Sequence, residues 1–342
     1  MKIEEIAIVT LVLVGSISSA GAADSKAIVP EPSSSGSYRQ PVDEAWFTGP
    51  LDAPNPTPIP VGHFYAEPYL LSSIIYGAYD GEWNVHRLAH IDYSIISSTL
   101  LETGIFQNVS LAILPEFGYN IAGAAENSSG IRFGDFQVRL KWMLHQFNEG
   151  SWIPTITLAA MEIFPTGSYD NLGSRPANGF GSGAYTSRFA LYSQKLVWLP
   201  NGRILRARFD FTANVPIGNV GVDNVSVYGT PEGFRGESKV GNSYTADLGF
   251  EYSVTSNWVA VMEFVYQHGD STLTIGNQLL ADSTTPVPFR SASVSSEYWS
   301  VAPAVEYNFN ANVGIIAGAE ISFAGRNTGA SVTHQIALSW FF

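Results

Sequence analysis

Charged side chains recur at alternate positions in several runs of this chain, and they are the groups best able to act on a small molecule. Five are basic: Arg139, Lys141, Lys195, Arg206 and Arg208. Five acidic ones lie further along: Asp247, Glu251, Glu263, Glu306 and Glu320. Because side chains alternate between the two faces of a strand, charges spaced in this way share one face. If that face lines a bore, the separated bases and acids create a field across it that would tune permeation. Alternatively, they form salt bridges that fill the interior.

Hydrolytic chemistry would need a nucleophile within hydrogen-bond reach of a histidine, and a third group to orient the ring. Two candidate pairs are His268 with Ser271 and His334 with Ser331. Neither belongs to a recognisable catalytic motif. The run from His86 to His90 has the histidine spacing of a zinc-protease helix, but Arg87 replaces the glutamate base. We therefore predict no catalytic residue, no metal site and no cofactor, and a lipid hydrolase is the least favoured function.

The composition fits a β protein whose exterior does not face water. The 342 residues include 13% aromatic residues and 32 glycines, but only 14% charged residues, against about a quarter in ordinary soluble domains. The absence of cysteine excludes disulfides and thiolate chemistry. The net charge of −13, without a Lys/Arg cluster, argues against a nucleic-acid partner.

The charged positions lie in about 12 strand-like runs bounded by turn residues. We place these runs near 63–77, 84–100, 108–122, 131–147, 153–167, 184–198, 203–216, 242–254, 258–270, 295–309, 313–325 and 331–342. Every second connection is short: 101–107, 148–152, 200–202, 255–257 and 310–312. The others include long stretches at 168–183, 217–241 and 271–294. Short turns at one end and long loops at the other are typical of a transmembrane β-barrel with periplasmic turns and outer loops.

The last strand-like run ends in an apolar face formed by Ile336, Leu338, Trp340 and Phe342. Further aromatic residues fall near predicted strand ends on the same side: Trp142, Trp198, Trp258, Tyr307 and Phe309. Such girdles mark membrane interfaces. A terminal Phe preceded by alternating apolar residues resembles the signal by which bacterial outer-membrane barrels are recognised for insertion. We therefore expect two partners, outer-membrane lipid and the barrel assembly machinery.

The N-terminal part has two segments that precede the predicted barrel. Residues 1–22 have the short apolar core and the small-residue cleavage site of a secretory signal peptide. Residues 23–61 are rich in Pro and Ser and form a periplasmic leader or plug. The apolar patch from Trp46 to Leu51 suggests either a plug in or below a barrel, or a linker with one adhesive patch, which is the simpler interpretation.

Several short motifs resemble the outer-membrane transporters named for the meta-pathway of phenol degradation. They are FTGPL at 47–51, GDFQVRLKWML at 134–144, FPTGSY at 164–169, the hairpin VTSNWVAVMEF at 254–264, and the terminal Phe342. The resemblance covers most of the chain beyond the signal peptide. It implies a channel or transporter for small hydrophobic or aromatic compounds, with no catalytic residues.

Together these features predict an all-β protein of the bacterial cell outer membrane, with residues 62–342 forming an antiparallel up-and-down transmembrane β-barrel. The predicted function is a channel or transporter whose partner is a small-molecule permeant. The alternative is a non-conducting structural or surface-interaction barrel whose long loops bind a partner, and an outer-membrane lipid hydrolase comes last.

Overall fold

The structure is a computed structural model that describes residues 38–279 and 285–342. The predicted signal peptide and the leader up to residue 37 lie outside the described residues. Among the described residues, no helix is long and apolar enough to cross a membrane. The helices there are two single 3-10 turns, η1 (Val42–Glu44) and η2 (Pro176–Asn178).

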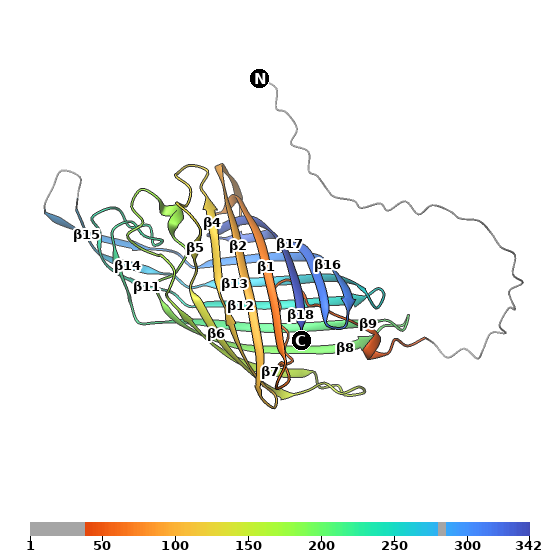
Figure 1. Ribbon diagram of the computed structural model, residues 1–342. Coiled ribbons are helices and arrows are strands. Elements are labelled where there is room, and N and C mark those ends of the chain that lie inside the picture. The colour runs from red at the N-terminus through yellow and green to blue at the C-terminus, as the bar shows by residue number, and fades with distance from the viewer. Residues whose placement is uncertain (1–37, 280–284) are drawn as a thin grey trace, which may run out of the picture. The chain divides into compact units, whose positions relative to one another are not determined.

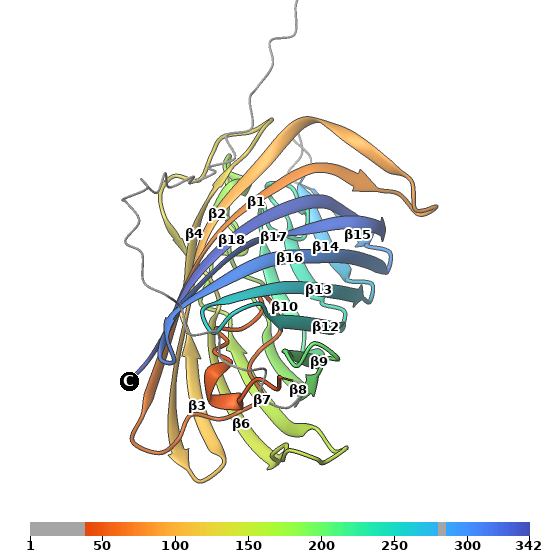
Figure 2. The same ribbon diagram turned by 90° about the vertical axis from the view of Figure 1, so that its right-hand side faces the viewer.

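Twelve antiparallel strands of the described chain close into a barrel, as predicted (Figures 1 and 2). They are β1 (Phe64–Tyr79), β2 (Val85–Phe106), β3 with β4 (Val109–Leu114 and Glu116–Ile121), β6 (Phe136–His145), β7 (Thr155–Phe164), β8 (Tyr185–Trp198), β9 (Ile204–Ile217), β12 (Ser243–Ser253), β13 (Trp258–Gly269), β16 (Ser296–Asn310), β17 (Val313–Arg326) and β18 (Thr328–Phe341). β1 pairs with both β2 and β18, which closes the sheet on itself.

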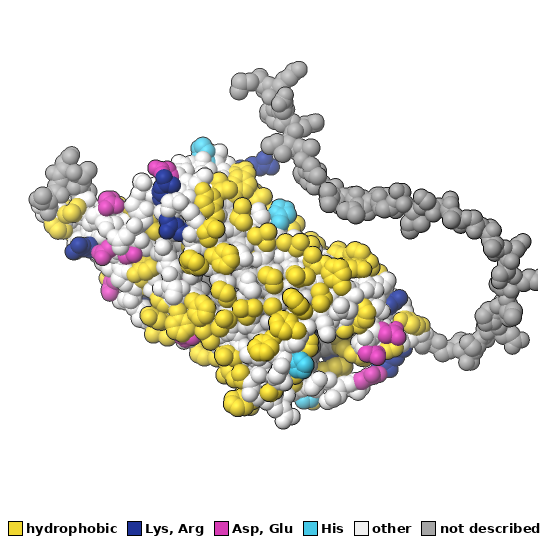
Figure 3. Space-filling model, viewed as in Figure 1, with side chains coloured by type: hydrophobic (Ala, Val, Ile, Leu, Met, Phe, Trp, Pro, Cys, Tyr) yellow, Lys and Arg dark blue, Asp and Glu magenta, His cyan; other side chains and the backbone are white. Residues whose placement is uncertain are grey.

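The barrel is apolar outside and charged inside, which is the reverse of a soluble protein. Outward side chains such as Leu140, Trp142 and Phe209 are exposed, and hydrophobic side chains cover the visible wall in Figure 3. Inward side chains on the same strands, such as Lys141 and Arg208, are buried. This arrangement suits lipid outside the barrel, because a closed barrel pairs its backbone groups internally and presents apolar side chains to the hydrocarbon.

The two ends of the barrel differ in their connections. At one end, here called the turn end, neighbouring strands are joined by the short connections 107–108, 146–154, 199–203, 254–257 and 311–312. At the other, the loop end, the connections include 165–184, 218–242 and 270–295. The predicted alternation of short and long connections is therefore present, with the N-terminal start of β1 at the turn end.

The long connections contain strands that the sequence interpretation treated as loops. β10 (Val220–Asp223), β11 (Arg235–Lys239), β14 (Leu273–Leu279) and β15 (Pro286–Ala292) form a separate four-stranded sheet, here called the outer sheet. Its buried core includes Val220, Val222 and Phe234, and the Phe289 ring lies 5.1 Å from that of Phe234. The loops between β9 and β12 and between β13 and β16 thus share one small folded unit (Figure 1).

One part of the barrel wall at the loop end is completed by a loop. Pro115, which cannot donate to a ladder, separates β3 from β4. β3 pairs with β6, but β4 pairs with the two-residue strand β5 (Arg132–Phe133) instead. Loop 165–184 contacts β4 there, since Asn120 Nδ2 donates to the Ala177 carbonyl at 3.0 Å. The wall beside Pro115 therefore depends on side-chain hydrogen bonds as well as on strand pairing.

Candidate functional site

Residues 38–61, here called the lumen segment, enter the barrel at its turn end. The side chain of Gln40 is almost fully buried. Its backbone N–H donates to the Gly202 carbonyl at 2.8 Å, and Trp198 Nε1 donates to the Gln40 carbonyl at 2.9 Å. Its side-chain carbonyl also accepts the N–H of Ile204 at 3.1 Å. The start of the segment is thus fixed to the turn between β8 and β9.

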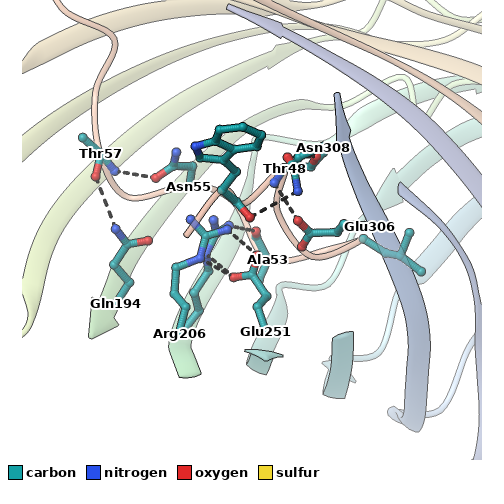
Figure 4. Close-up of polar contacts among 12 residues, drawn as sticks. Thr48, Ala53, Asn55, Thr57, Gln194, Arg206, Glu251, Glu306 and Asn308 are labelled. Atoms are coloured by element: carbon teal, nitrogen blue, oxygen red, sulfur yellow. Dashed lines mark hydrogen bonds and ion pairs between the residues drawn. The ribbon is translucent and has the colours of Figure 1, made fainter. Parts of the chain in front are cut away.

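Acidic side chains of the wall accept the backbone N–H groups of residues 48–53. Glu306 on β16 accepts the N–H of Thr48 at 2.6 Å, and the Thr48 hydroxyl lies 3.0 Å from Asn308 Oδ1 (Figure 4). Glu263 on β13 accepts the N–H groups of Leu51, Asp52 and Ala53, the last at 3.0 Å. Each of these bonds to Glu306 or Glu263 satisfies a backbone N–H group that has no partner in a strand.

Basic side chains on the opposite part of the wall donate to the carbonyls of residues 53–57. Arg208 Nη1 on β9 donates to the Ala53 carbonyl at 2.8 Å. Lys141 Nζ on β6 donates to the Asn55 carbonyl at 2.8 Å. Together with the acid contacts, these bonds explain why the sequence separates its bases from its acids: the lumen segment crosses from one wall to the other with its N–H groups and carbonyls satisfied by opposite charges.

The FTGPL motif anchors the segment through apolar contacts. Leu51 is 4% exposed and belongs to a buried cluster with Val259, Val261, Ala302, Ala304, Ile316 and Ala337. Phe47 packs against this cluster, and the Arg206 guanidinium carbon lies 4.3 Å from the centroid of its ring. A cation over an aromatic ring contributes about 0.5–2 kcal/mol, depending on desolvation. The apolar patch seen in the sequence is therefore seated on β13, β16, β17 and β18.

The lumen charges also pair with one another, between strands that are adjacent or separated by one strand, rather than across the bore. Glu251 on β12 forms ion pairs with Arg206 and with Arg208, the latter at 3.3 Å. Glu102 on β2 forms ion pairs with Arg139 at 2.9 Å and Lys141 at 2.8 Å. Glu102 was absent from the predicted set, although it shares the inward alternation of Ile96, Ser98 and Leu100. The field across the bore is thus partly cancelled by local pairing.

Nine of the ten predicted lumen charges lie on the inward alternation of their strands. Eight are buried: Arg139, Lys141, Arg206, Arg208, Asp247, Glu251, Glu263 and Glu306. The ninth, Glu320, accepts a hydrogen bond from the Ser300 hydroxyl at 2.6 Å. Their role in permeation stays a prediction.

Lys195 and Trp198 were both assigned to the wrong face. Lys195 shares the outward alternation of Phe189 and Leu191, and its Nζ donates to the Trp152 carbonyl at 3.0 Å. Its position near the strand end lets a long side chain reach polar groups. Trp198 faces the lumen segment instead of forming part of the lipid girdle. At the centres of the strands, charged side chains point inward and apolar ones point outward. Lys195, near a strand end, and Trp198, beside the lumen segment, do not follow this pattern.

Two cavities follow one another along the bore. The first, of about 720 Å³, is lined by the lumen segment and by inward side chains of both walls. The second, of about 450 Å³, lies toward loop 165–184 and is lined by Asp135, Phe180 and Ser182 among others. Glu116 and Asn214 border both cavities. Loop 165–184 is tied inward at this point, since Asp135 accepts the N–H of Ser182 at 2.8 Å and that of Gly167 at 3.0 Å.

The serine and histidine pairs do not assemble a hydrolytic site. His268 Nε2 lies 3.2 Å from Asp270 Oδ1, and the Ser331 hydroxyl lies 3.3 Å from the Tyr298 hydroxyl. Within 38–279 and 285–342, no hydrogen bond joins either serine to its histidine. The His86 ring instead contacts Asp80 at 2.7 Å in the β1–β2 connection. There the ring hydrogen bond and the N–H groups of Asn84 and Glu82 lower the pKa of Asp80.

The C-terminal strand closes the barrel. β18 pairs with β1 from Tyr65 opposite Phe341 to Tyr79 opposite Thr328. The four predicted signal residues, Ile336, Leu338, Trp340 and Phe342, are exposed on the outer face. Their recognition by the assembly machinery stays a prediction.

Comparison with known proteins shows the fold of this chain but not a family to which it belongs. No family model and no curated protein matches the chain. The crystal structure of an outer membrane channel from Pseudomonas putida F1 matches with a TM-score of 0.64 at 15% identity, covering 85% of this chain and 100% of that one. The monoaromatic hydrocarbon channel TodX, as a deletion mutant, matches with a TM-score of only 0.38 at 9% identity, covering 82% and 90%. The closed barrel with its apolar exterior is the architecture of a bacterial outer-membrane protein, and the first of these matches shares its fold.

Proposed function

We propose that the protein is an outer-membrane channel for small molecules, and that the lumen segment is a plug that controls passage through it. The observation that carries this proposal is the crossing of the bore by residues 48–57 between an acidic and a basic wall. Neither a purely structural barrel nor a linker needs a lumen whose charges match the backbone groups of the segment inside it. A channel that is narrowed by a removable segment does need lumen charges that match the backbone groups of that segment.

The permeant proposed is small and partly apolar. A cavity of about 720 Å³ is within the range of about 300–1,000 Å³ typical of sites for small ligands. Its lining combines buried charges with Leu71, Ile96, Leu100 and Met161. The resemblance to transporters of the phenol meta-pathway supports aromatic compounds as the class to test first.

A reversible cross-link would test whether the lumen segment controls passage. A Cβ built on Gly249 would lie 3.7 Å from the Cβ of Pro50, close to the separation of about 3.8 Å found in disulfides. Because the chain has no cysteine of its own, the Pro50→Cys/Gly249→Cys double variant would form one defined bond. Conductance would be recorded in planar bilayers before and after reduction, beside the wild type and each single variant.

We expect the oxidised double variant to show the smallest and most uniform conductance, and reduction to restore the wild-type frequency of larger openings. The single variants should not respond to the reductant. Equal conductance of the oxidised and reduced forms would show that the segment is not a gate. If none of the proteins conducts and none admits small solutes into liposomes, the channel proposal itself fails.

The outer sheet favours a second candidate, a surface-interaction barrel. Folded strands with a core of their own are more than is needed to connect β9 to β12. In this case, deletion of 217–241 should abolish binding of a surface partner while leaving permeation unchanged. Deletion with no effect on any binding phenotype would remove this candidate.

A further inference from the structure

Two carboxyl groups face each other on the barrel wall, and most of their oxygens have no hydrogen-bond partner among the described residues. Asp210 on β9 is directly opposite Asp247 on β12 in the strand register. They are 3% and 4% exposed. Like charges directly opposite each other on a sheet are destabilising. An arrangement of this kind in a buried position needs a compensating group.

The described part of the chain compensates this pair only in part: Arg208 acts on Asp210 through its charge, and Glu263 is close enough to Asp247 to share a hydrogen bond. Both carboxyl oxygens of Asp210 and Oδ1 of Asp247 are buried without a hydrogen-bond partner there. The nearest base along β9 is Arg208, which is engaged by Glu251 and the Ala53 carbonyl. The other carboxylates of this region differ in this respect, since Glu263 accepts three N–H groups and Glu251 receives two arginines. Buried carboxylates cost several kcal/mol unless they are paired.

The position of the pair is in the bore, next to the plug. Gly249 is two residues from Asp247 and faces Pro50 of the lumen segment, so the pair lies one inward position beyond the crossing, toward the loop end. Both aspartates line the cavity of about 720 Å³. Arg188 also faces this cavity, but it pairs in register with Asn214, roughly 13 Å along the strand from Asp210 at about 3.3 Å per residue.

The rest of the cavity indicates what kind of cation would fit. Opposite the aspartates, Leu71, Ile96, Leu100 and Leu114 present apolar side chains. Tyr65 and Tyr69 add aromatic rings to the same side. Among the described residues, no group of three or more His, Asp or Glu side chains is arranged to hold a metal ion. The same wall also carries the buried Glu67 between the two tyrosines. A cavity that combines acidic groups with apolar and aromatic side chains suits a molecule with one cationic end and an apolar body.

We infer that Asp210 and Asp247 form a binding subsite for the ammonium group of a small organic amine, with its apolar part against β1, β2 and β3. This inference rests on the proposed channel function and names the class of permeant that the lumen retains. The ammonium donates hydrogen bonds to the free carboxyl oxygens and offsets their mutual repulsion. An alcohol of the same shape would lack the charge, and a carboxylate would be repelled.

Binding to the full-length protein in detergent micelles would test the subsite without requiring flux. Isothermal titration would use three probes of one shape: benzylamine, benzyl alcohol and benzoate. The variants are Asp210→Asn, Asp247→Asn and the double variant, which keep the side-chain volume. The matched control is Glu237→Gln, which neutralises an exposed acid on β11 of the outer sheet.

We expect the wild type to prefer benzylamine over both other probes. Each asparagine variant should weaken benzylamine binding by about tenfold or more, as expected for loss of a hydrogen bond to a charged group. The double variant should bind benzylamine and benzyl alcohol alike, and the control should match the wild type. Equal binding of amine and alcohol by the wild type, or no change in the variants, would overturn the subsite.

The same variants separate this inference from the channel proposal. If the protein binds benzylamine through the aspartates but passes no solute in liposomes, the subsite inference holds and the channel proposal fails. If the protein conducts, and the wild type and the double variant have the same cation preference, the channel proposal holds and the subsite inference fails.

Discussion

Gly104 of β2 and Ile59 of the lumen segment approach so closely that a side chain could not fit between them. A Cβ built on Gly104 would lie 2.3 Å from the Ile59 carbonyl oxygen. Val61 forms a parallel bridge with Gly104 at the same point. This position on the wall is thus shaped for the backbone that passes over it.

Substitution Gly104→Ala should therefore displace the end of the lumen segment. Overpacking of this kind costs about 1–3 kcal/mol, here borne by the segment, because the wall is held by strand pairing. We expect faster limited proteolysis within 45–61 and an intact, heat-modifiable barrel on detergent gels. Gly130→Ala is the control, since nothing lies within 4 Å of its added Cβ. The same cleavage rate in both variants would contradict the prediction.

Glu263→Gln should loosen the centre of the plug. A glutamine offers one acceptor oxygen where the carboxylate accepts the N–H groups of Leu51, Asp52 and Ala53, and bonds to a charged group contribute about 1.5–3 kcal/mol. Hydrogen exchange of these three amides should accelerate by about tenfold or more, while amides of β13 keep their protection. Exchange that stays slow at residues 51–53 would mean that the carboxylate does not hold the segment.

Removal of one partner of the Arg206–Glu251 pair should cost more than removal of both. Glu251→Gln leaves Arg206 and Arg208 buried without their acid, at a cost of about 3–5 kcal/mol. The double variant Arg206→Gln/Glu251→Gln should recover part of that loss. Urea unfolding of the barrel in liposomes measures the free energies of unfolding of the wild type, of Glu251→Gln, of Arg206→Gln and of the double variant. Additive losses would show that the two side chains are energetically independent.

Tyr228 predicts a pH dependence at the loop end. Burial raises its pKa to about 12, with further contributions from Asp135 and Tyr169, and its hydroxyl donates to the Ser182 carbonyl. The unfolded pKa is about 10, so this contribution to stability is complete below about pH 10 and is lost as the pH rises through 12. Hydrogen exchange of 226–230 should accelerate in this window, and Tyr228→Phe should remove the dependence. An unchanged pH profile in that variant would refute it.

The barrel could be predicted from the sequence because the patterns that specify it can be seen within single strands and single connections. Alternation along each strand, as in Leu140 to Trp142, follows from lipid on one side, and the parity of short and long connections follows from crossing a membrane. The prediction for Lys195 was wrong because this residue lies on the outward face near the strand end, where a long charged side chain can reach polar groups.

The lumen segment and the outer sheet could not be predicted in the same way. Residues 38–61 have no period, since their structure comes from single contacts such as Glu306 with Thr48. The four strands of the outer sheet come from two different connections, and contacts such as that between the Phe234 and Phe289 rings join residues that are far apart in the sequence. Asp210 lies opposite Asp247 because of the register between β9 and β12. The spacing of charges within one strand does not reveal that register.

The two attachments of the lumen segment have a topological consequence. Gln40 is bound beside Gly202 and Val61 beside Gly104, and both glycines lie near the turn end of the barrel. The segment is therefore a loop with both ends at the same mouth of the barrel, and it does not pass from one mouth to the other. If it is the plug proposed above, it can leave through the mouth by which it entered, without any strand of the wall unpairing.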